Sequence, residues 1–271
     1  MCRGIRPIVG TTIVGVHCLS SELKSIHVSP RLRTFRRHAV DTAIARVERI
    51  GKRVLVWLGG EEHAIVFEPR MTGLVLLADP PTEKHLRFRL DLGGSEHAHL
   101  WYWDRRGLGS VRLLCRTDVD ERLASSRLGP DALTLDAERL RERLGHRQRP
   151  IKVALLDQTA LAGIGNLYAS EILHVAGIDP RVACQRLTSG QWQRLATSMR
   201  QVLEEAIRYE GSTLADGTYR TALSRAGRYQ NRHRVYQRAG QLCLTCRRGT
   251  VQRIVQAQRA TFYCSVCQKR G

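Results

Sequence analysis

Two Cys-x-x-Cys pairs near the end of the chain restrict its fold more than any other feature. The pairs are Cys243/Cys246 and Cys264/Cys267, and seventeen residues separate them. This spacing is typical of a zinc ribbon, in which four thiolates surround one Zn²⁺ tetrahedrally. Such a closed site is structural, because it shapes a segment too short and too polar to fold by burial alone. The alternatives are two coincidental pairs or a redox disulfide.

The segment between the two pairs is expected to form a β-hairpin. It runs from Val251 to Tyr263 and carries Arg253 and Arg259 without any acidic residue. A bound metal would fix the direction of these guanidinium groups, which suit the phosphates of nucleic acid.

The charge of the chain also indicates a polyanionic partner. The net charge is +19, and residues 217–271 contain twelve Lys and Arg but no Asp or Glu. Nucleic acid is favoured over a membrane surface, because the sequence has no basic amphipathic helix, lipidation motif or apolar run of spanning length. Solubility or a general preference for Arg would explain the arginine content, but not the absence of acids from one long segment.

The other four cysteines predict a reducing environment. They have no spacing typical of a disulfide framework, and the N-terminus lacks a secretory signal. We therefore expect free thiols and a cytoplasmic location. These cysteines are Cys2, Cys18, Cys115 and Cys184.

Periodicity divides the chain into three predicted domains of a multidomain α+β protein. Residues 1–123 contain short apolar runs with partial alternation, which predicts an antiparallel β-sandwich. Residues 124–226 change to helical spacing and are expected to form a helical domain. Residues 227–271 contain the zinc ribbon. In Leu86–Leu90 a period of two places arginines on one face, and a solvated face is favoured there over a DNA-binding one.

Residues 151–180 are interpreted as two helices joined by a glycine turn. Val153–Leu161 is the first predicted helix, Gly163–Gly165 forms the turn, and Asn166 is a plausible N-cap of the second helix. A dinucleotide-binding loop is excluded, since Tyr168 occupies the third glycine position and no strand precedes the turn. The helix start suits a phosphate, although an ordinary helical hairpin explains the pattern equally well.

Two long motifs in this order resemble the formamidopyrimidine-DNA glycosylase family. Leu161–Glu171 is similar to the helix-two-turns-helix signature of that family, and Gln258–Cys264 is similar to its zinc-finger end. The resemblance spans nearly the whole chain. It implies base-excision repair of oxidised purines, 8-oxoguanine or formamidopyrimidine, which are flipped out of duplex DNA. An amine then attacks the sugar C1′ to form a Schiff base, and β- and δ-elimination cut the strand.

The resemblance also implies roles for individual residues. Lys52 looks like the lysine that donates a proton during elimination, and Arg259 like the zinc-finger arginine that grips the phosphate beside the lesion. Met71, Arg106 and Leu108 resemble the trio that fills the space left by the extruded base. Four further residues fall at positions that contact DNA in the family: His85, Arg147, Lys152 and Asn166. By composition alone, Lys52 would be a surface residue at a strand end and Met71 a core residue.

Three features depart from the family pattern. Leu108 stands where the family usually has Phe, so a wedge here would rely on aliphatic bulk rather than aromatic stacking. Gly107 replaces an expected Arg, which removes a possible phosphate contact. The two cysteine pairs also lie one residue further apart than expected.

The first residues differ from the family as well. Members begin Met-Pro-Glu-Leu-Pro-Glu, and the proline exposed by removal of Met is the nucleophile, whereas this chain begins Met-Cys-Arg-Gly-Ile-Arg-Pro. We therefore expect the catalytic Pro-Glu segment to be absent from the printed chain and its activity to be impaired. Either the natural protein starts upstream and is active, which we favour, or the chain is shortened and binds damaged DNA without turnover.

The sequence thus predicts a bifunctional DNA glycosylase and abasic-site lyase with one structural Zn²⁺. It would act as a monomer on damaged double-stranded DNA of the nucleoid, without a membrane or a small-molecule cofactor. A catalytically silent lesion or abasic-site binder shares every feature except the first residues. An RNA-binding zinc-ribbon protein is the third alternative, but RNA readers use aromatic platforms, and aromatic residues make up only 6% of this chain.

Overall fold

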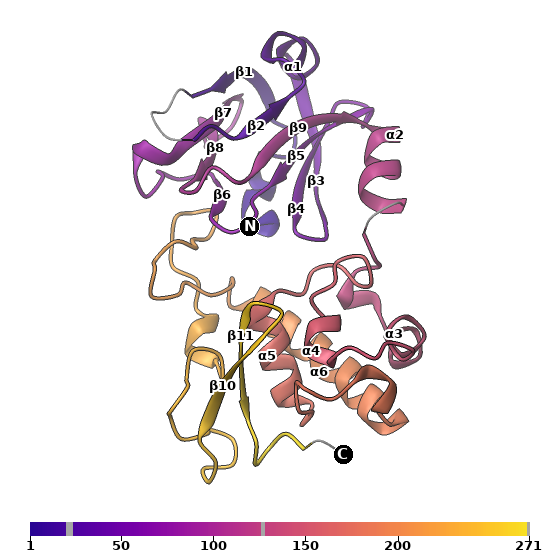
Figure 1. Cartoon of the computed structure of the whole chain (residues 1–271). Helices are drawn as coiled ribbons and strands as arrows, with labels where there is room; N and C mark the ends of the chain where they lie inside the picture. The colour runs from indigo at the N-terminus through magenta and orange to yellow at the C-terminus, as the bar shows by residue number, and fades with distance from the viewer. Residues whose placement is uncertain (20–23, 126–127, 270–271) are drawn as a thin grey trace. The chain divides into compact units, whose positions relative to one another are not determined.

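The computed structural model describes residues 1–19, 24–125 and 128–269. Figure 1 shows the course of the chain through its sheet-rich and helix-rich parts. Among the described residues, no helix is long and apolar enough to cross a membrane.

The chain divides into two compact units, and each contains two separate segments. Unit 1 comprises Met1–Ser126 with Glu210–Arg228, and unit 2 comprises Arg127–Tyr209 with Tyr229–Gly271. The zinc ribbon therefore belongs to the same compact unit as the helices, while a later loop segment joins the sheet. The three domain boundaries predicted from the sequence stay a prediction.

Unit 1 is built on one nine-stranded sheet with the strand order β2-β9-β5-β4-β3-β1-β7-β8-β6. All neighbouring strands are antiparallel except β2 and β9, which are parallel. The strands are β1 (Thr12–Cys18), β2 (His27–Ser29), β3 (Thr42–Ile50), β4 (Arg53–Leu58), β5 (His63–Glu68), β6 (Gly73–Leu76), β7 (Leu86–Gly93), β8 (His99–Asp104) and β9 (Ser110–Cys115).

One apolar core lies between the two halves of this sheet. Strands β1 and β3 pair over only two residues, and side chains from both sides of this narrow junction meet in the same core. Phe88 is at its centre, with ring centroids 5.3 Å from Phe35 and 6.3 Å from Phe67. Alternating apolar residues point inward along the strands, as burial of one strand face requires. The predicted sandwich is confirmed.

The expected solvated arginine face of Leu86–Leu90 is wrong for Arg87. Its side chain is only 2% exposed, and its Nε donates to the carbonyl of Asp104 over 3.0 Å. The register between β7 and β8 shifts between Leu86 and Phe88, so the alternation of exposed and buried residues breaks at this position. Arg89 follows the prediction better, since it is part-exposed and pairs with Asp91.

Short helices and one later segment complete unit 1. Ala222, in the later segment, is buried, and its carbonyl accepts a hydrogen bond from Leu77 N over 2.8 Å. A Cβ on Gly4 would lie 2.7 Å from the Ala222 side chain, so glycine permits this close approach. The helices are η1 (Cys2–Ile8), α1 (Leu32–Ala39), η2 (Glu83–His85), α2 (Arg116–Val119) and η3 (Asp120–Ser125).

Unit 2 packs its helices around α6 and adds a two-stranded hairpin. Asp136 caps α3 by accepting from Arg139 N, and Thr188 with Gln191 forms a capping box at the start of α6. Its elements are η4 (Ala132–Thr134), α3 (Ala137–Leu144), α4 (Ile151–Ala154), α5 (Asn166–Val175), η5 (Cys184–Arg186), α6 (Ser189–Arg208), η6 (Tyr229–Arg232), β10 (Val251–Gln256) and β11 (Arg259–Cys264).

The predicted helical pair in residues 151–180 is only partly correct. The first helix, α4, is a single turn that ends at Ala154, and turns follow it. These turns are held by Gln158, whose Nε2 donates to the Leu156 and Ile164 carbonyls. The second helix forms as expected, but Gly165 is its N-cap and Asn166 its first residue. The Asn166 side chain is therefore available for other contacts.

Candidate nucleic-acid interface

The four cysteines of the two pairs come together at the base of the β10/β11 hairpin. Their sulfur atoms all lie within 4.8 Å of one another. The Sγ atoms of Cys243 and Cys267 are 3.7 Å apart, and those of Cys246 and Cys264 are 3.8 Å apart. Sulfurs bonded to one tetrahedral Zn²⁺ at about 2.3 Å would be separated by about 3.8 Å, whereas a disulfide needs about 2.05 Å. The cluster thus fits a metal site rather than a disulfide.

A buried histidine connects this cluster to α5. His174 Nε2 lies 2.8 Å from Thr245 Oγ1, and its Nδ1 lies 3.1 Å from Gln268 Oε1. Thr245 lies inside the first cysteine pair and Gln268 directly follows the second. Burial lowers the pKa of His174, which favours the neutral ring. Sequence reasoning missed this residue, because a single histidine in a helix carries no pattern of its own.

Three of the predicted DNA-contact residues converge where α4, α5 and the hairpin meet. Lys152 Nζ donates to Asn166 Oδ1 over 2.6 Å, and Asn166 Nδ2 donates to the Ala260 carbonyl over 2.9 Å. Ala260 directly follows Arg259, whose side chain is exposed. Asn166 therefore connects the helical region to the strand that carries Arg259.

Lys152 occupies an unusual position for a lysine. Its side chain is buried, and burial, reinforced by the nearby Arg259 charge, lowers its pKa to about 8. A lysine in such surroundings gains from an anion beside it, because the anion stabilises the charged form. Lys152 has no exposed surface, and its assignment as a DNA contact stays a prediction.

The turn of the hairpin also favours an exposed Arg259. Ala257 and Gln258, the two residues between β10 and β11, have φ values of 46° and 58°. Left-handed backbone at both positions is typical of a tight type I′ hairpin turn. Neither residue is glycine, so this turn is held in a conformation that L-residues rarely adopt.

A buried glutamate on α5 fixes the chain that leads into the zinc ribbon. Glu171 has no exposed surface, and its carboxylate accepts hydrogen bonds of 2.8 to 3.0 Å from the backbone N–H groups of Arg234, Val235 and Tyr236. Three such bonds compensate the loss of water around the charge. Glu171 belongs to the motif quoted above, but its structural task is visible only in the folded chain.

The three residues predicted to fill the space of an extruded base lie on two turns of unit 1. Met71 is 73% exposed in the turn after β5, and Leu108 is 40% exposed in the turn after β8. Arg106 is exposed on the second turn. Such exposure of large apolar side chains is costly in water and suits insertion between bases.

A buried carboxylate ties these two turns together. Asp104 Oδ1 accepts hydrogen bonds from Thr72 Oγ1 and Arg106 N, and Asp104 Oδ2 accepts one from Gly109 N. Asp104 has no exposed surface, so these bonds are shielded from water. Thr72 and Asp104 were not predicted as site residues, although a polar residue at the end of an apolar strand is a weak indication.

Lys52 and His85 are also part of unit 1. Lys52 is exposed in the turn between β3 and β4, next to Gly51 with its φ of 58°. The ring of His85 packs edge-on against Trp103, with centroids 5.2 Å apart. Burial, followed by the charges of Arg87 and Lys84, lowers the pKa of His85. At neutral pH its ring is thus biased towards the neutral form.

Arg147 already has an anionic partner within unit 2. Its Nη1 lies 2.7 Å from Asp157 Oδ2. Although burial opposes the shift, hydrogen bonds from Thr159 and Arg147 lower the pKa of Asp157 to about 2. A phosphate would therefore have to compete with this carboxylate for Arg147. Its assignment as a DNA contact stays a prediction.

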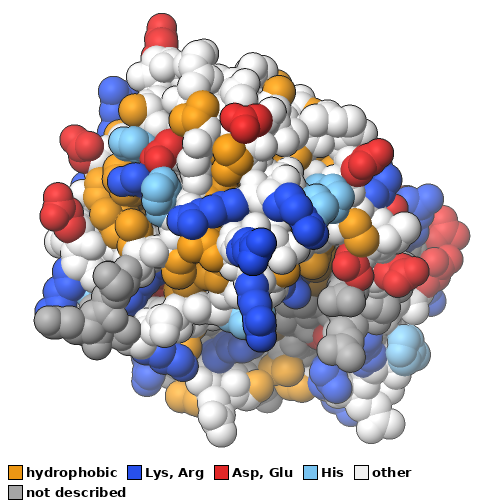
Figure 2. Space-filling view, turned by 90° about the horizontal axis from the view of Figure 1, so that it is seen from above, with side chains coloured by type: hydrophobic (Ala, Val, Ile, Leu, Met, Phe, Trp, Pro, Cys, Tyr) orange, Lys and Arg blue, Asp and Glu red, His pale blue; other side chains and the backbone are white. Residues whose placement is uncertain are grey.

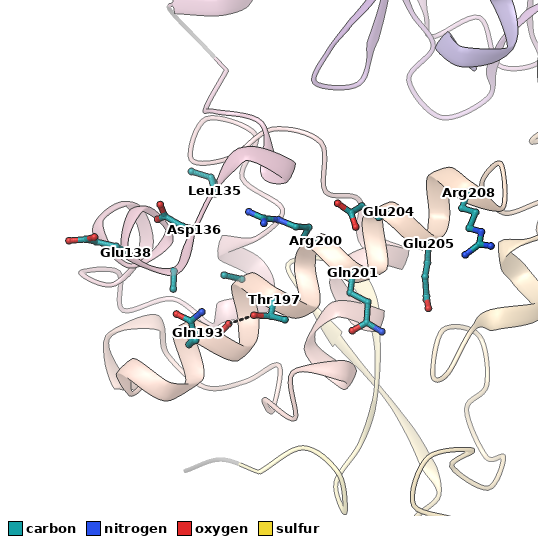
Figure 3. A pocket seen from close by; sticks show the side chains of 12 residues that line it. Leu135, Asp136, Glu138, Gln193, Thr197, Arg200, Gln201, Glu204, Glu205 and Arg208 are labelled. Carbon is teal, nitrogen blue, oxygen red and sulfur yellow. Dashed lines mark hydrogen bonds between the residues drawn. The ribbon is translucent and has the colours of Figure 1, made fainter.

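A groove lies elsewhere in unit 2, between the start of α3 and α6. Figure 3 shows Asp136 and Glu138 on one side and Arg200, Glu204 and Glu205 along α6. None of the predicted site residues lines it. The groove therefore contributes nothing to the candidate interface.

The comparisons with known proteins agree with this arrangement. A model of the formamidopyrimidine-DNA glycosylase N-terminal domain matches residues 1–111, and a model of the H2TH domain of that enzyme matches residues 128–217. A formamidopyrimidine-DNA glycosylase of Chloroflexus aurantiacus is 41% identical over 82% of this chain and 80% of its own length. One from Laribacter hongkongensis is 37% identical over 97% of this chain and 98% of its own length.

Solved structures give the same result. The MutM (Fpg) protein of Thermus thermophilus is 34% identical, with a TM-score of 0.84 over 100% of this chain and 96% of that chain. A Lactococcus lactis Fpg variant, solved with Fapy-dG-containing DNA, is 28% identical, with a TM-score of 0.83 over 97% of this chain and 94% of that chain. The chain belongs to the formamidopyrimidine-DNA glycosylase family.

Proposed function

We propose that this protein removes oxidised purines, 8-oxoguanine and formamidopyrimidine, from double-stranded DNA and then cuts the strand at the abasic site. The observation that carries the proposal is the convergence of Lys152, Asn166 and Arg259 on one strand end in a chain of this family. Two cations beside an amide that positions the hairpin suit a DNA phosphate. Lesion DNA in complex with a Lactococcus lactis relative supports the substrate class.

The proposed chemistry begins with an amine that attacks the sugar C1′. This bond forms as the bond to the damaged base breaks, and the resulting Schiff base makes the C2′ proton acidic. Loss of that proton expels the 3′ phosphate, and a second elimination expels the 5′ phosphate. We assign proton donation in these steps to Lys52 and the grip on the flanking phosphate to Arg259.

The remaining site residues are assigned to binding and distortion of the duplex. Met71, Arg106 and Leu108 would occupy the space left by the extruded base, since they are exposed on turns tied to one carboxylate. Two residues complete the proposed DNA contacts, His85 and Arg147.

We further propose that the four cysteines bind one structural Zn²⁺. The sulfur separations and the all-thiolate donor set support zinc over harder cations such as Mg²⁺, which prefer oxygen ligands. A Zn²⁺ ion at this site would cross-link the ribbon and would take no part in the reaction. We also propose that the protein acts as a monomer in the cytoplasm.

Borohydride trapping on an 8-oxoguanine duplex tests the proposed function. Reduction of the Schiff base would give a covalent protein–DNA adduct, and an undamaged duplex would give none. Lesion binding without an adduct would instead support the catalytically silent binder. Tighter binding of single-stranded RNA than of lesion duplex would overturn both.

A further inference from the structure

The exposed side of α1 carries a concentration of positive charge that the proposed function does not use. Phe35 and Ala39 are buried and fix the orientation of the helix. Figure 2, which looks onto this end of unit 1, shows Lys and Arg side chains gathered in the middle of the face, with acidic side chains around them. Four exposed arginines belong to α1 and its N-cap and are called here the α1 arginines: Arg31, Arg33, Arg36 and Arg37.

Within the described part of unit 1, the α1 arginines form no ion pair with a carboxylate, whereas several other arginines do. Among the residues that the structure describes, no carboxylate oxygen lies within 4.0 Å of Arg31, Arg33 or Arg37. Arg36 Nε donates to the Val16 carbonyl over 2.9 Å. Several arginines elsewhere in the unit do pair with acids: Arg46 with Glu48 and Glu61, Arg112 with Glu68, and Arg116 with Glu61.

Helix stability does not account for this arrangement. Arg36 and Arg37 lie in the last turn, where positive charge is favourable because of the helix dipole. Arg31 is the N-cap residue and Arg33 lies in the first turn, where positive charge is unfavourable. Placing four arginines along the whole helix therefore costs stability at one end, and indicates a ligand that compensates the charge.

Two histidines border the same region. The rings of His38 and His63 are 4.7 Å apart, and Arg37 Nη2 lies 3.5 Å from His38 Nε2. Burial, then the His63 and Arg37 charges, lower the pKa of His38. The surroundings of this residue are thus positive without a compensating anion, although Asp41 and Glu62 are close in sequence.

This region lies far from the turns that carry Met71 and Leu108. His63 begins β5 and Glu68 ends it, and the Met71 turn follows directly. A six-residue strand spans about 17 Å at 3.3 to 3.4 Å per residue. The α1 arginines and the Met71 turn therefore lie at opposite ends of β5.

We propose that the α1 arginines bind the phosphate backbone of a second DNA segment, separate from the lesion duplex. This proposal rests on the proposed function only in taking the first DNA segment to be a lesion duplex. Arg33 and Arg37, four residues apart, present guanidinium forks side by side, which suits successive phosphates. A membrane is disfavoured, because α1 exposes no large apolar side chain for insertion.

Capture of a second duplex tests this proposal. The full chain is bound to beads that carry an uncleavable lesion duplex, excess protein is washed away, and capture of a labelled undamaged duplex is measured. Arg33→Gln/Arg37→Gln should reduce capture roughly tenfold and lower the slope of log affinity against log salt by about 2. Arg139→Gln/Arg143→Gln is the matched control, since these exposed arginines have the same spacing on α3, another eight-residue helix.

Each outcome decides the proposal. Equal capture by the α1 variant and the wild type would overturn it, as would equal losses in the α1 and α3 variants. If the α1 variant loses the binding of poly-glutamate that the wild type shows, but captures the duplex equally well, the partner is an acidic protein and the DNA assignment is overturned. If the wild type is not retained on lesion beads, the proposed function fails, and the salt slope for undamaged duplex in solution still decides the role of α1.

Discussion

Thr72 Oγ1 donates a hydrogen bond to Oδ1 of buried Asp104 over 2.5 Å, across 32 positions of the sequence. This contact links the turn that carries Met71 to the turn that carries Arg106 and Leu108. A single carboxylate thus sets the separation of the three side chains proposed to fill the space of an extruded base. Their geometry depends on a residue that need not touch DNA.

Loss of this contact should impair base extrusion more than duplex binding. Thr72→Val removes the hydroxyl hydrogen bond to the buried Asp104 carboxylate, which keeps only its two backbone donors, and we expect a loss of about 1–3 kcal/mol in the free energy of unfolding. The fluorescence of 2-aminopurine beside the lesion rises when the base is unstacked. The rise caused by binding of Thr72→Val should be several-fold smaller than the rise caused by the wild type. Thr72→Ser keeps the hydroxyl and should restore the response. An unchanged response in Thr72→Val would contradict the positioning role.

Replacement of Leu108 should alter the same response without affecting stability. Leu108→Phe adds an aromatic surface that stacks on bases, and we expect a larger fluorescence change, whereas Leu108→Ala should reduce it. Leu108 is 40% exposed, so both variants should keep the melting temperature of the wild type. Val14→Ala is a matched control, because Val14 is also exposed, on β1 away from this turn. Equal responses of all variants would argue against a wedge at this position.

Removal of the metal should unfold the hairpin that carries Arg259. We expect one Zn²⁺ per chain by elemental analysis, and loss of DNA binding by at least about tenfold after chelation, because the metal supplies folding free energy to this segment. Cys264→Ser should have the same effect. Cys18→Ser, at an exposed cysteine outside the cluster, should keep both zinc and binding. A folded, DNA-binding Cys264→Ser protein would contradict a structural metal site.

The lowered pKa of Lys152 predicts that the affinity for DNA depends on pH. Its pKa of about 8 in the folded chain means that its positive charge, proposed to attract a DNA phosphate, is lost as pH rises through this value. We expect affinity to fall between pH 7 and 9.5, with a midpoint above 8 because the bound phosphate stabilises the ammonium. Lys152→Gln should bind more weakly at pH 7 and lose this part of the pH dependence. An identical pH profile in the variant would exclude Lys152 as the titrating group.

The same pKa shift predicts that the free energy of unfolding changes with pH in the opposite direction to the DNA affinity. The pKa of Lys152 lies near 8 in the folded chain and at its ordinary value of 10.5 when unfolded. Between these values the unfolded chain binds more protons, so the contribution of Lys152 to stability rises with pH. Urea unfolding at pH 7 and pH 9.5 should show a smaller gain in Lys152→Gln than in the wild type. An equal gain would mean that the lysine is not perturbed by burial.

The sequence by itself determined the metal cluster, the family and the order of the elements. The four cysteines are recognisable because two Cys-x-x-Cys pairs at this separation are typical of a metal-binding ribbon, and the sandwich because alternating apolar residues must face one core. Each of these patterns is contained in a few neighbouring residues. No knowledge of distant contacts is needed to detect them.

Tertiary structure alone decided how the site residues are held. Asn166 was expected to cap a helix, but its amide instead bridges Lys152 to the carbonyl of Ala260, 94 positions away. Arg87 was expected in solvent, but a break in strand register buries it against Asp104. A hydrogen bond between residues so far apart in sequence depends on strand register and helix packing, which arise only when the whole unit folds.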